Sequence, residues 1–413
     1  MSTNTAVKDI SPSLTEKILS GLPNHLATRI FSSCPSSRNE SWKYTPLHNW
    51  IEPILETPTH DGLIPQVKEG QNMLYFFNGK LIHIHLSSEL ENCIEVHPGQ
   101  TDIQPDFPLL PEKDNNHFFT ELASLAPHAG YLIRVKAETR PAANLHILYD
   151  WDGAHHVLNT LNHIVVEKNA SLQLLVESKS SATTSVLHNQ LTRIWLHEDA
   201  SLTLYRMHNT SSGFSLIDEL SCTVEYRARF HACQVTAGGG LIRNNYKVCL
   251  NGESADANLR ALNILSGNTH ADSHVTMIHQ SPSCTSNQTF KSIVSQEATA
   301  VFSGTIHVER DAQKTNAFQS SRSILLGDKS RSYAKPRLEI YADDVKCSHG
   351  ATTGQINQEA LFYLQSRGIS LPTARNMLIA AFASDVLTGI ENEDYLQKAQ
   401  ALIENFTGVH EIE

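Results

Sequence analysis

Two neighbouring segments of this 413-residue chain repeat one pattern without a gap. Residues 161–174, LNHIVVEKNASLQL, align with residues 191–204, LTRIWLHEDASLTL, and matching apolar residues fall at the same places. A weaker similarity relates residues 291–309 to residues 322–340 at about the same displacement. A repeat of this length built from short strands and turns is typical of stacked coils that bury a shared core. We therefore predict a mainly β fold with a β-helix core, while two similar hairpins of a β-sandwich remain the alternative.

Helical patterns flank the β region. Residues 13–31 predict a helix, because Ser13 and Glu16 form a capping box and apolar residues recur at intervals of four. A Pro-rich linker follows, and then short apolar alternations broken by Asn, Gly, Asp and Ser begin. The expected organisation is an N-terminal helical region over residues 1–70, a β-helix core over residues 71–345 and a C-terminal helical domain over residues 346–413.

The C-terminal region carries signals for three helices. Asn357 and Gly368 predict the start and end of the first helix, and Ser370 with Pro372 predicts the start of the second. Apolar residues then recur along one side of the second and third helices. We expect this domain either to cover the last coil of the β core or to dock a partner.

Composition argues against several classes of protein. Asp and Glu number 43 against 32 Lys and Arg, and the formal charge of -11 disfavours a nucleic-acid partner. No stretch approaches the roughly 20 apolar residues of a membrane-spanning helix, and the N-terminus lacks the apolar core of a signal peptide. We therefore expect a cytoplasmic protein without membrane contact. The seven cysteines lie at irregular gaps with no CxxC, which argues against a disulfide framework and a zinc knuckle.

The common motifs of catalysis are missing from the sequence. It contains no P-loop for a nucleotide, no G-x-S-x-G elbow and no H-E-x-x-H. The glycine-rich stretch TAGGGLI, residues 236–242, fits no nucleotide motif and predicts a tight turn. We expect that this chain binds no ATP and is not an enzyme.

Histidine is frequent, with 22 residues, and three pairs could each bring two imidazoles together. Metal binding and ordinary surface hydrogen bonding are both open for these pairs. The pairs are His83 with His85, His155 with His156, and His270 with His274.

Cys347 and His349 stand where the β pattern ends and the helical pattern begins. On an extended backbone, residues two apart share one face and lie about 6.5 to 7 Å apart at Cα. A thiolate and an imidazole at this separation can lean toward one soft or borderline metal. Two ligands are fewer than a closed site needs, so other residues or another chain must complete such a site. The alternative is a half-buried cysteine and a polar histidine without a ligand role.

The same region carries a family resemblance. The segment DDVKCSHGATTGQINQEALFYLQSRGIS from residue 343, with ARNMLIAAF from residue 374, resembles the C-terminal signature of the SufB/SufD family of iron–sulfur cluster assembly proteins. SWKYTPL, residues 41–47, resembles the N-terminal signature of the SufD branch. The resemblance extends over the whole chain, and its CSHGAT and LFYLQSRG stretches favour SufD over SufB.

The resemblance implies a fold and a set of partners. The fold would be a right-handed parallel β-helix between N-terminal and C-terminal helical regions. The chain would be a non-catalytic scaffold subunit of a SufBCD complex, paired with a SufB-like subunit through the ends of the β-helix. A SufC-like ABC-type ATPase would bind the C-terminal helices and hydrolyse the ATP. The open edge of a coil also predicts a homodimer when the chain is alone.

The resemblance also implies site residues. His349 would be an interface ligand for a transient iron–sulfur cluster or iron shared with the SufB-like subunit, and Cys347 would be a weaker one. A reduced flavin belongs to the assembled complex in some family members. From the region and its amphipathic pattern we expect the ATPase to contact Phe362, Tyr363, Arg367, Met377, Leu378 and Phe382.

Two other functions remain open from the sequence. A β-helix enzyme that acts on polysaccharide is one, although such enzymes are usually secreted and this chain shows no export signal. A purely structural interaction module, in which His349 binds nothing, is the other.

Overall fold

A computed structural model of the chain describes residues 27, 28, 30, 33–35, 39–45, 47, 71–99, 107, 118–125, 127–152, 156–180 and 186–409. The helix expected over residues 13–31 and the Pro-rich linker lie largely outside these residues. The described part of that segment includes Ile30, which is helical and buried.

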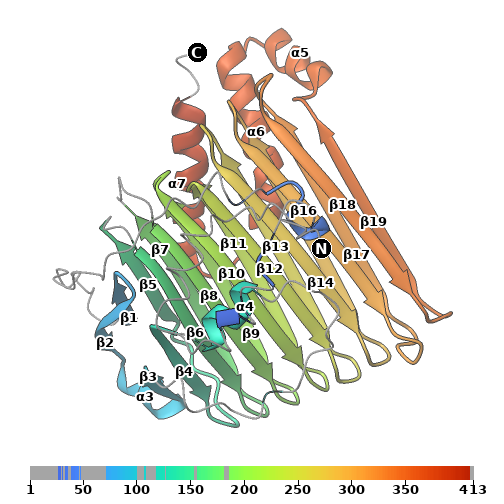
Figure 1. Ribbon diagram of the computed structural model, residues 1–413. Helices are drawn as coiled ribbons and strands as arrows, with labels where there is room; N and C mark the ends of the chain where they lie inside the picture. The colour runs from blue at the N-terminus through green and yellow to red at the C-terminus, as the bar shows by residue number, and fades with distance from the viewer. Residues whose placement is uncertain are drawn as a thin grey trace, which may run out of the picture.

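Two long sheets of parallel strands dominate the described part of the chain (Figure 1). Ten strands form sheet A, in the order β19-β17-β15-β13-β11-β9-β7-β5-β1-β2, and nine form sheet B, in the order β18-β16-β14-β12-β10-β8-β6-β4-β3. From β4 onward the chain alternates between the sheets, and each strand pairs in parallel with the strand two places later. The parallel β-helix is therefore confirmed, and the sandwich of hairpins is excluded.

The strands of sheet A are β1 (Asn72–Phe77), β2 (Lys80–His85), β5 (Leu145–Trp151), β7 (Ser171–Ser180), β9 (Ser201–Thr210), β11 (Arg229–Gly238), β13 (Asp256–Leu265), β15 (Thr285–Val294), β17 (Asn316–Leu325) and β19 (Lys346–Gly354). The strands of sheet B are β3 (Ile94–Pro98), β4 (Ala129–Val135), β6 (His156–Val166), β8 (Val186–Leu196), β10 (Phe214–Val224), β12 (Leu241–Leu250), β14 (His270–His279), β16 (Thr299–Val308) and β18 (Arg331–Ile340). The helices are η1 (Glu40–Trp42), α3 (Ser88–Cys93), α4 (Phe118–Leu125), α5 (Gln358–Ser366), α6 (Leu371–Leu387) and α7 (Glu393–Val409).

The repeat seen in the sequence is one coil of the β-helix. Leu161 of β6 pairs with Leu191 of β8, at the displacement that the two segments show in the sequence. The weaker similarity is also real, since Lys291 of β15 pairs with Arg322 of β17. Both pairs of segments therefore lie in adjacent coils.

The two repeated segments share a turn from sheet B to sheet A, formed by NAS at residues 169–171 and by DAS at residues 199–201. Asn169 and Asp199 turn the chain with φ of 57°, in the left-handed region that Asn and Asp tolerate better than most residues. The next residue is a buried alanine, and its N–H closes the turn: Ala170 donates to Glu167 O at 3.1 Å and Ala200 to His197 O at 3.0 Å. The small side chain lets successive corners stack.

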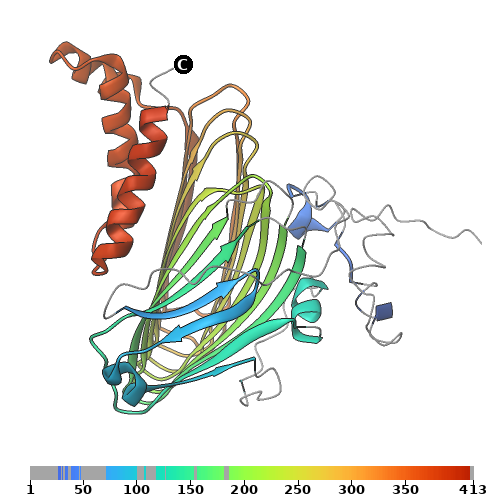
Figure 2. The same cartoon turned by 90° about the vertical axis from the view of Figure 1, so that its left-hand side faces the viewer.

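Apolar side chains fill three layers. The largest cluster lies between the two sheets, and a second lies between the outer face of sheet A and helices α6 and α7. A third lies on the outer face of sheet B, where α4 and Trp42 contact it. Figure 2 shows the C-terminal helices on one side of the β-helix, with α4 and the short N-terminal segment on the other.

Helix α5 begins and ends, and helix α6 begins, where the sequence predicts. Asn357 caps α5 by accepting a hydrogen bond from Ala360 N at 2.9 Å, and Gly368 follows the helix with φ of 85°. Ser370 caps α6 by accepting from Thr373 N at 3.3 Å. Helices α6 and α7 run along sheet A and do not close the last coil (Figure 2).

The structure corrects one domain boundary. Residues 346–354, which we expected to belong to the C-terminal helical domain, form β19 and pair with β17 from Asn316↔Lys346 to Ile324↔Gly354. This segment is rich in Gly, Ser and Thr and lacks the apolar alternation of the earlier strands. The ladder to β17 holds it extended, so the β-helix ends at residue 354.

Candidate functional site

The two ends of the β-helix differ. At the N-terminal end β2 pairs antiparallel with β1, and β3 pairs antiparallel with β4. Helix α3 lies between β2 and β3 in the chain. At the C-terminal end β18 and β19 are the last strands of their sheets, and within the described ranges no strand pairs with their outer edges. Unpaired strand edges invite another chain to add on. The outer edges of β2 and β3 are likewise unpaired among the described residues, but there an antiparallel strand covers the first coil, whereas the parallel coils themselves end at β18 and β19. We call the C-terminal end the open end.

Cys347 and His349 lie on this open end, in β19. They pair in the ladder with Ala317 and Gln319 of β17, two residues that are buried between the sheets. Ladder neighbours in a parallel sheet share a face, so Cys347 and His349 continue the interior face of the β-helix onto its last coil. In the described part of the chain no further coil covers them, and His349 is exposed and Cys347 half-buried.

The chemistry of the pair suits part of a metal site. Burial raises the pKa of the Cys347 thiol, against a smaller opposing effect of the Ala317 backbone, so a metal must displace its proton. Among the described residues no three or more His, Cys, Asp and Glu side chains come together to hold a metal ion. The structure thus brings the two predicted ligands to one face without completing a coordination shell.

The other histidine pairs have varied surroundings. His83 and His85 lie on edge strand β2, and His155 lies outside the described residues. His270 and His274 lie on the outer face of β14 beside Asp272. His274 contacts the Asp272 carboxylate directly, and His270 contacts Thr45, which also bonds this carboxylate.

Exposed apolar side chains surround the open end. Tyr341, in the turn between β18 and β19, has 60% of its surface exposed. Ile340 and Phe318 are also exposed large hydrophobic residues on the last coils. Aromatic and aliphatic groups around an unpaired sheet edge are typical of a surface that a partner covers.

The six residues expected to contact an ATPase fall into two groups. Phe362, Tyr363, Arg367 and Met377 are exposed, and 73% of Phe362 is accessible. Figure 1 shows that α5 projects beyond the ends of the strands. The Arg367 guanidinium lies 5.3 Å from the centre of the Tyr363 ring. Leu378 and Phe382 are half-buried against the cluster on sheet A.

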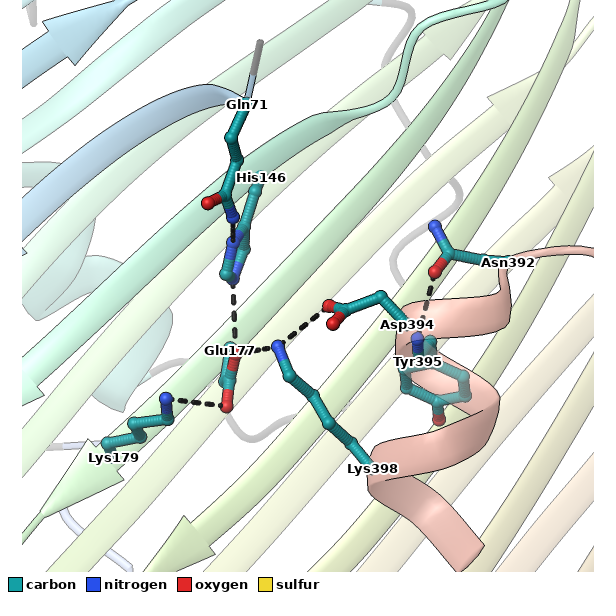
Figure 3. A network of polar contacts seen from close by, with 8 residues as sticks. All are labelled: Gln71, His146, Glu177, Lys179, Asn392, Asp394, Tyr395 and Lys398. Atoms are coloured by element: carbon teal, nitrogen blue, oxygen red, sulfur yellow. Dashed lines mark hydrogen bonds and ion pairs between the residues drawn. The ribbon is translucent and has the colours of Figure 1, made fainter. Parts of the chain in front are cut away.

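Helix α7 is held on sheet A by an ionic network around a buried carboxylate, drawn in Figure 3. Glu177 of β7, only 3% exposed, lies 3.0 Å from Lys398 Nζ of α7 and 3.2 Å from Lys179 Nζ. His146 Nε2 is 3.2 Å from the same carboxylate, while the Gln71 amide donates to His146 Nδ1. Burial alone would raise the pKa of Glu177, but His146 and the two ammonium groups together lower it to about 2.

Further contacts attach both α6 and α7 to the same sheet. Lys291 of β15 is buried, lies 2.5 Å from the Asp385 carboxylate and donates to Phe382 O at 2.7 Å. The buried Tyr395 hydroxyl of α7 lies 3.1 Å from Arg206 O and 3.0 Å from Cys233 O. These anchors were not predictable from the sequence, because each joins residues far apart in the chain with no motif between them.

In the described ranges the structure contains no helix that is both long and apolar enough to cross a lipid bilayer.

Comparison with known proteins identifies the family of the chain. Residues 149–382 match the family described as SUF system FeS cluster assembly, SufBD core domain. The chain is 29% identical to the iron–sulfur cluster assembly protein SufD of Escherichia coli over 393 residues, which cover 92% of this chain and 90% of that protein. It is 33% identical to an iron–sulfur cluster assembly SufBD family protein of Synechocystis over 288 residues, 67% of this chain and 63% of that protein. The chain therefore belongs to the SufBD family of iron–sulfur cluster assembly proteins.

Proposed function

We propose that this protein is the non-catalytic scaffold subunit of an iron–sulfur cluster assembly complex. A SufB-like subunit adds to the outer edges of β18 and β19, and a SufC-like ABC-type ATPase binds α5 and the start of α6. The observation that carries the proposal is the open end, where two strand edges, exposed aromatic groups and His349 lie together.

The substrate of the shared site is a nascent cluster or its iron. His349 supplies an imidazole from this chain, and Cys347 supplies a second, weaker donor once its thiol loses its proton. Because the described residues bring no third ligand to this pair, the SufB-like subunit contributes the remaining donors. A reduced flavin is part of the proposal only for the assembled complex and is assigned to no residue of this chain.

The ATPase acts through the helices. Exposed Phe362, Tyr363, Arg367 and Met377 provide its contact surface, while Leu378 and Phe382 tie that surface to sheet A. A partner can shift an equilibrium only if it binds one arrangement more tightly than the other. Since α6 and α7 are joined to β7, β11 and β15 by buried contacts, a displacement of the helices by the ATPase carries the sheet with it.

The proposal also covers the location of the complex and the oligomeric state of the isolated chain. The complex works in the cytoplasm, away from membranes and nucleic acid, and this chain binds no ATP. Without its SufB-like partner the same open edges allow a second copy to add, which gives a homodimer. Membership of the SufBD family favours this function over a polysaccharide-active enzyme.

Single substitutions at the two surfaces test the proposal. The chain is produced together with SufB-like and SufC-like subunits and isolated through a tag on this chain. Tyr341→Asp places a charge at the open end and is expected to release the SufB-like subunit while the ATPase stays. Phe362→Asp is expected to do the reverse.

Tyr226 offers a matched control, because this exposed tyrosine lies at a corner of a middle coil, far in the chain from both surfaces. Tyr226→Asp should keep both partners. Retention of both partners by Tyr341→Asp and Phe362→Asp would show that the two surfaces are assigned wrongly. Absence of any complex with the unmodified chain would contradict the proposed partners.

A further inference from the structure

An open pocket of about 330 Å³ lies on the outer face of sheet B. One wall is the N-terminal arm, which we define as residues 39–45, and the floor comes from β14, β16 and β18. The residues that line it are Glu40, Ser41, Tyr44, Thr45, Asp272, His274, Val301, Phe302, Ser303, Ser332, Tyr333, Ala334 and Lys335. We call it the arm pocket.

A buried ionic network builds the floor and holds the arm. Asp272 and Arg243 are both fully buried, with Arg243 Nη1 2.7 Å from the carboxylate and 2.8 Å from Ser41 O. The guanidinium also lies 3.7 Å from the ring centre of Trp42, which is itself buried. Thr45 donates to Asp272 at 2.5 Å. Each partner of the buried carboxylate is thus fixed, and the arm is held at a defined distance from the sheet.

Polar side chains line up across the floor. His274 pairs in the ladder with Ser303, and Ser303 pairs with Lys335, so an imidazole, a hydroxyl and an ammonium stand on adjacent strands about 4.8 Å apart. Asp272 Oδ1 lies 3.0 Å from His274 Nε2 and fixes the orientation of this ring. In this row the Ser303 hydroxyl and the Lys335 ammonium are the groups that can donate hydrogen bonds to the oxygens of an anion.

A carboxylate of the chain itself, that of Glu40, already occupies the cationic end of this row. The exposed Glu40 carboxylate of the arm forms ion pairs with both Lys335 and Arg337 of β18, and both cations reach the same oxygen, Oε1. These bonds and charges lower the pKa of Glu40. Because the pair is open to solvent, an anion from solution competes with Glu40 for the two cations at little penalty.

Aromatic rings form the side of the pocket. The Tyr44 ring from the arm and the Tyr333 ring from β18 are stacked, with centres 4.4 Å apart and planes 14° apart. Both rings are more than one-third exposed, so their edges and the faces turned away from the stack are available to a planar group.

From this combination we propose that the arm pocket binds a phosphate monoester that carries a planar ring. The phosphate takes the place of the Glu40 carboxylate at Lys335 and Arg337 and accepts a further hydrogen bond from Ser303. A dianion with three free oxygens satisfies this set better than a carboxylate with two. The ring packs against Tyr44 and Tyr333. Tyr333, Lys335 and Arg337 belong to β18, whose outer edge is also part of the open end, so the proposal is tested on the chain alone, without the partners of that end.

Calorimetric titration of the full chain tests the proposal with four probes: phenyl phosphate, inorganic phosphate, benzoate and phenol. Phenyl phosphate should bind at least tenfold more tightly than each of the other three. Lys335→Gln should weaken phenyl phosphate at least tenfold, and Glu40→Gln should strengthen it by removing the competing carboxylate. Tyr333→Leu should weaken phenyl phosphate and leave inorganic phosphate unchanged, which separates the ring contact from the ionic contact.

Lys168→Gln is the matched control, since Lys168 forms an exposed ion pair with Glu198 at a distant corner. It should leave every affinity unchanged. Equal binding of phenyl phosphate and inorganic phosphate, tighter binding of benzoate, or absence of phenyl phosphate binding would each overturn the proposal. So would a Lys335→Gln chain that melts at the same temperature as the unmodified chain and binds phenyl phosphate equally well.

Discussion

Neutralising Glu177 should loosen the attachment of α7 to sheet A and lower the stability of the protein. Its pKa of about 2, against the ordinary value of 4.5, corresponds to about 3 kcal/mol of folding free energy at neutral pH. Glu177→Gln keeps the shape of the side chain but leaves Lys398 and His146 without their shared anion. We expect a loss of about 3 kcal/mol at pH 7, measured by urea denaturation.

The pH dependence provides a stricter test. Because the folded-state pKa is lowered, the contribution of Glu177 is fully present above pH 4.5 and is lost as the pH falls from there through about 2. The stability difference between the unmodified chain and Glu177→Gln should therefore shrink to about 2 kcal/mol at pH 3.5. Glu198→Gln, which removes an exposed pair with Lys168, should change stability little at any pH. A Glu177→Gln chain as stable as the unmodified one, or a stability difference that stays constant with pH, would show that Glu177 does not stabilise the attachment of α7.

Three further substitutions probe separate parts of the fold. Gly130→Ala should lower the stability of the protein by about 3 kcal/mol or more, because the new Cβ would lie 1.9 Å from the Leu161 carbonyl oxygen. Gly354→Ala is its control: the new Cβ would meet nothing within 4 Å, and the protein should melt at nearly the unmodified temperature. Tyr395→Phe should lose about 1 to 3 kcal/mol in urea denaturation, since Arg206 O and Cys233 O lose a buried donor; unchanged stability would remove this anchor from the account. Asn357→Ala should lose about 1 kcal/mol of α5 stability, seen as faster amide exchange confined to α5, and exchange that stays protected would contradict the cap.

The β-helix was predictable because its signals are local and repeated. Asn169 and Ala170 recur as Asp199 and Ala200, and each pair supplies a left-handed residue and a small buried residue at the same corner. The helix starts at Asn357 and Ser370 are similarly local, since a cap acts on the N–H three residues later. Patterns of this kind reflect short-range constraints, which a sequence records directly.

Contacts between distant segments were not predictable. Glu177 and Lys398 lie 221 residues apart, and neither stands in a motif that indicates the other. The arm pocket likewise depends on Thr45 meeting Asp272, 227 residues away. The extent of the β-helix was misjudged for the same reason, because β19 owes its extended form to pairing with β17 and has no apolar alternation of its own.

The candidate metal ligands Cys347 and His349 were identified by residue type and spacing, and the structure shows their surroundings. Residues two apart on a strand share a face, as Cys347 and His349 do on β19. The sequence could not show that this face is the interior of the last coil, uncovered only because the β-helix ends there. That position is what connects a possible ligand to a surface for a partner.

The most direct test of the account is anaerobic reconstitution of the isolated three-subunit complex with iron and sulfide, followed by its visible absorbance. We expect the complex with His349→Ala to assemble normally and to fail to gain the iron–sulfur absorbance. Ser348→Ala changes the adjacent residue on the opposite face of β19, and its complex should gain the absorbance as the unmodified complex does. Equal absorbance from the His349→Ala complex and the unmodified complex would contradict the role of His349 as a ligand of the shared cluster.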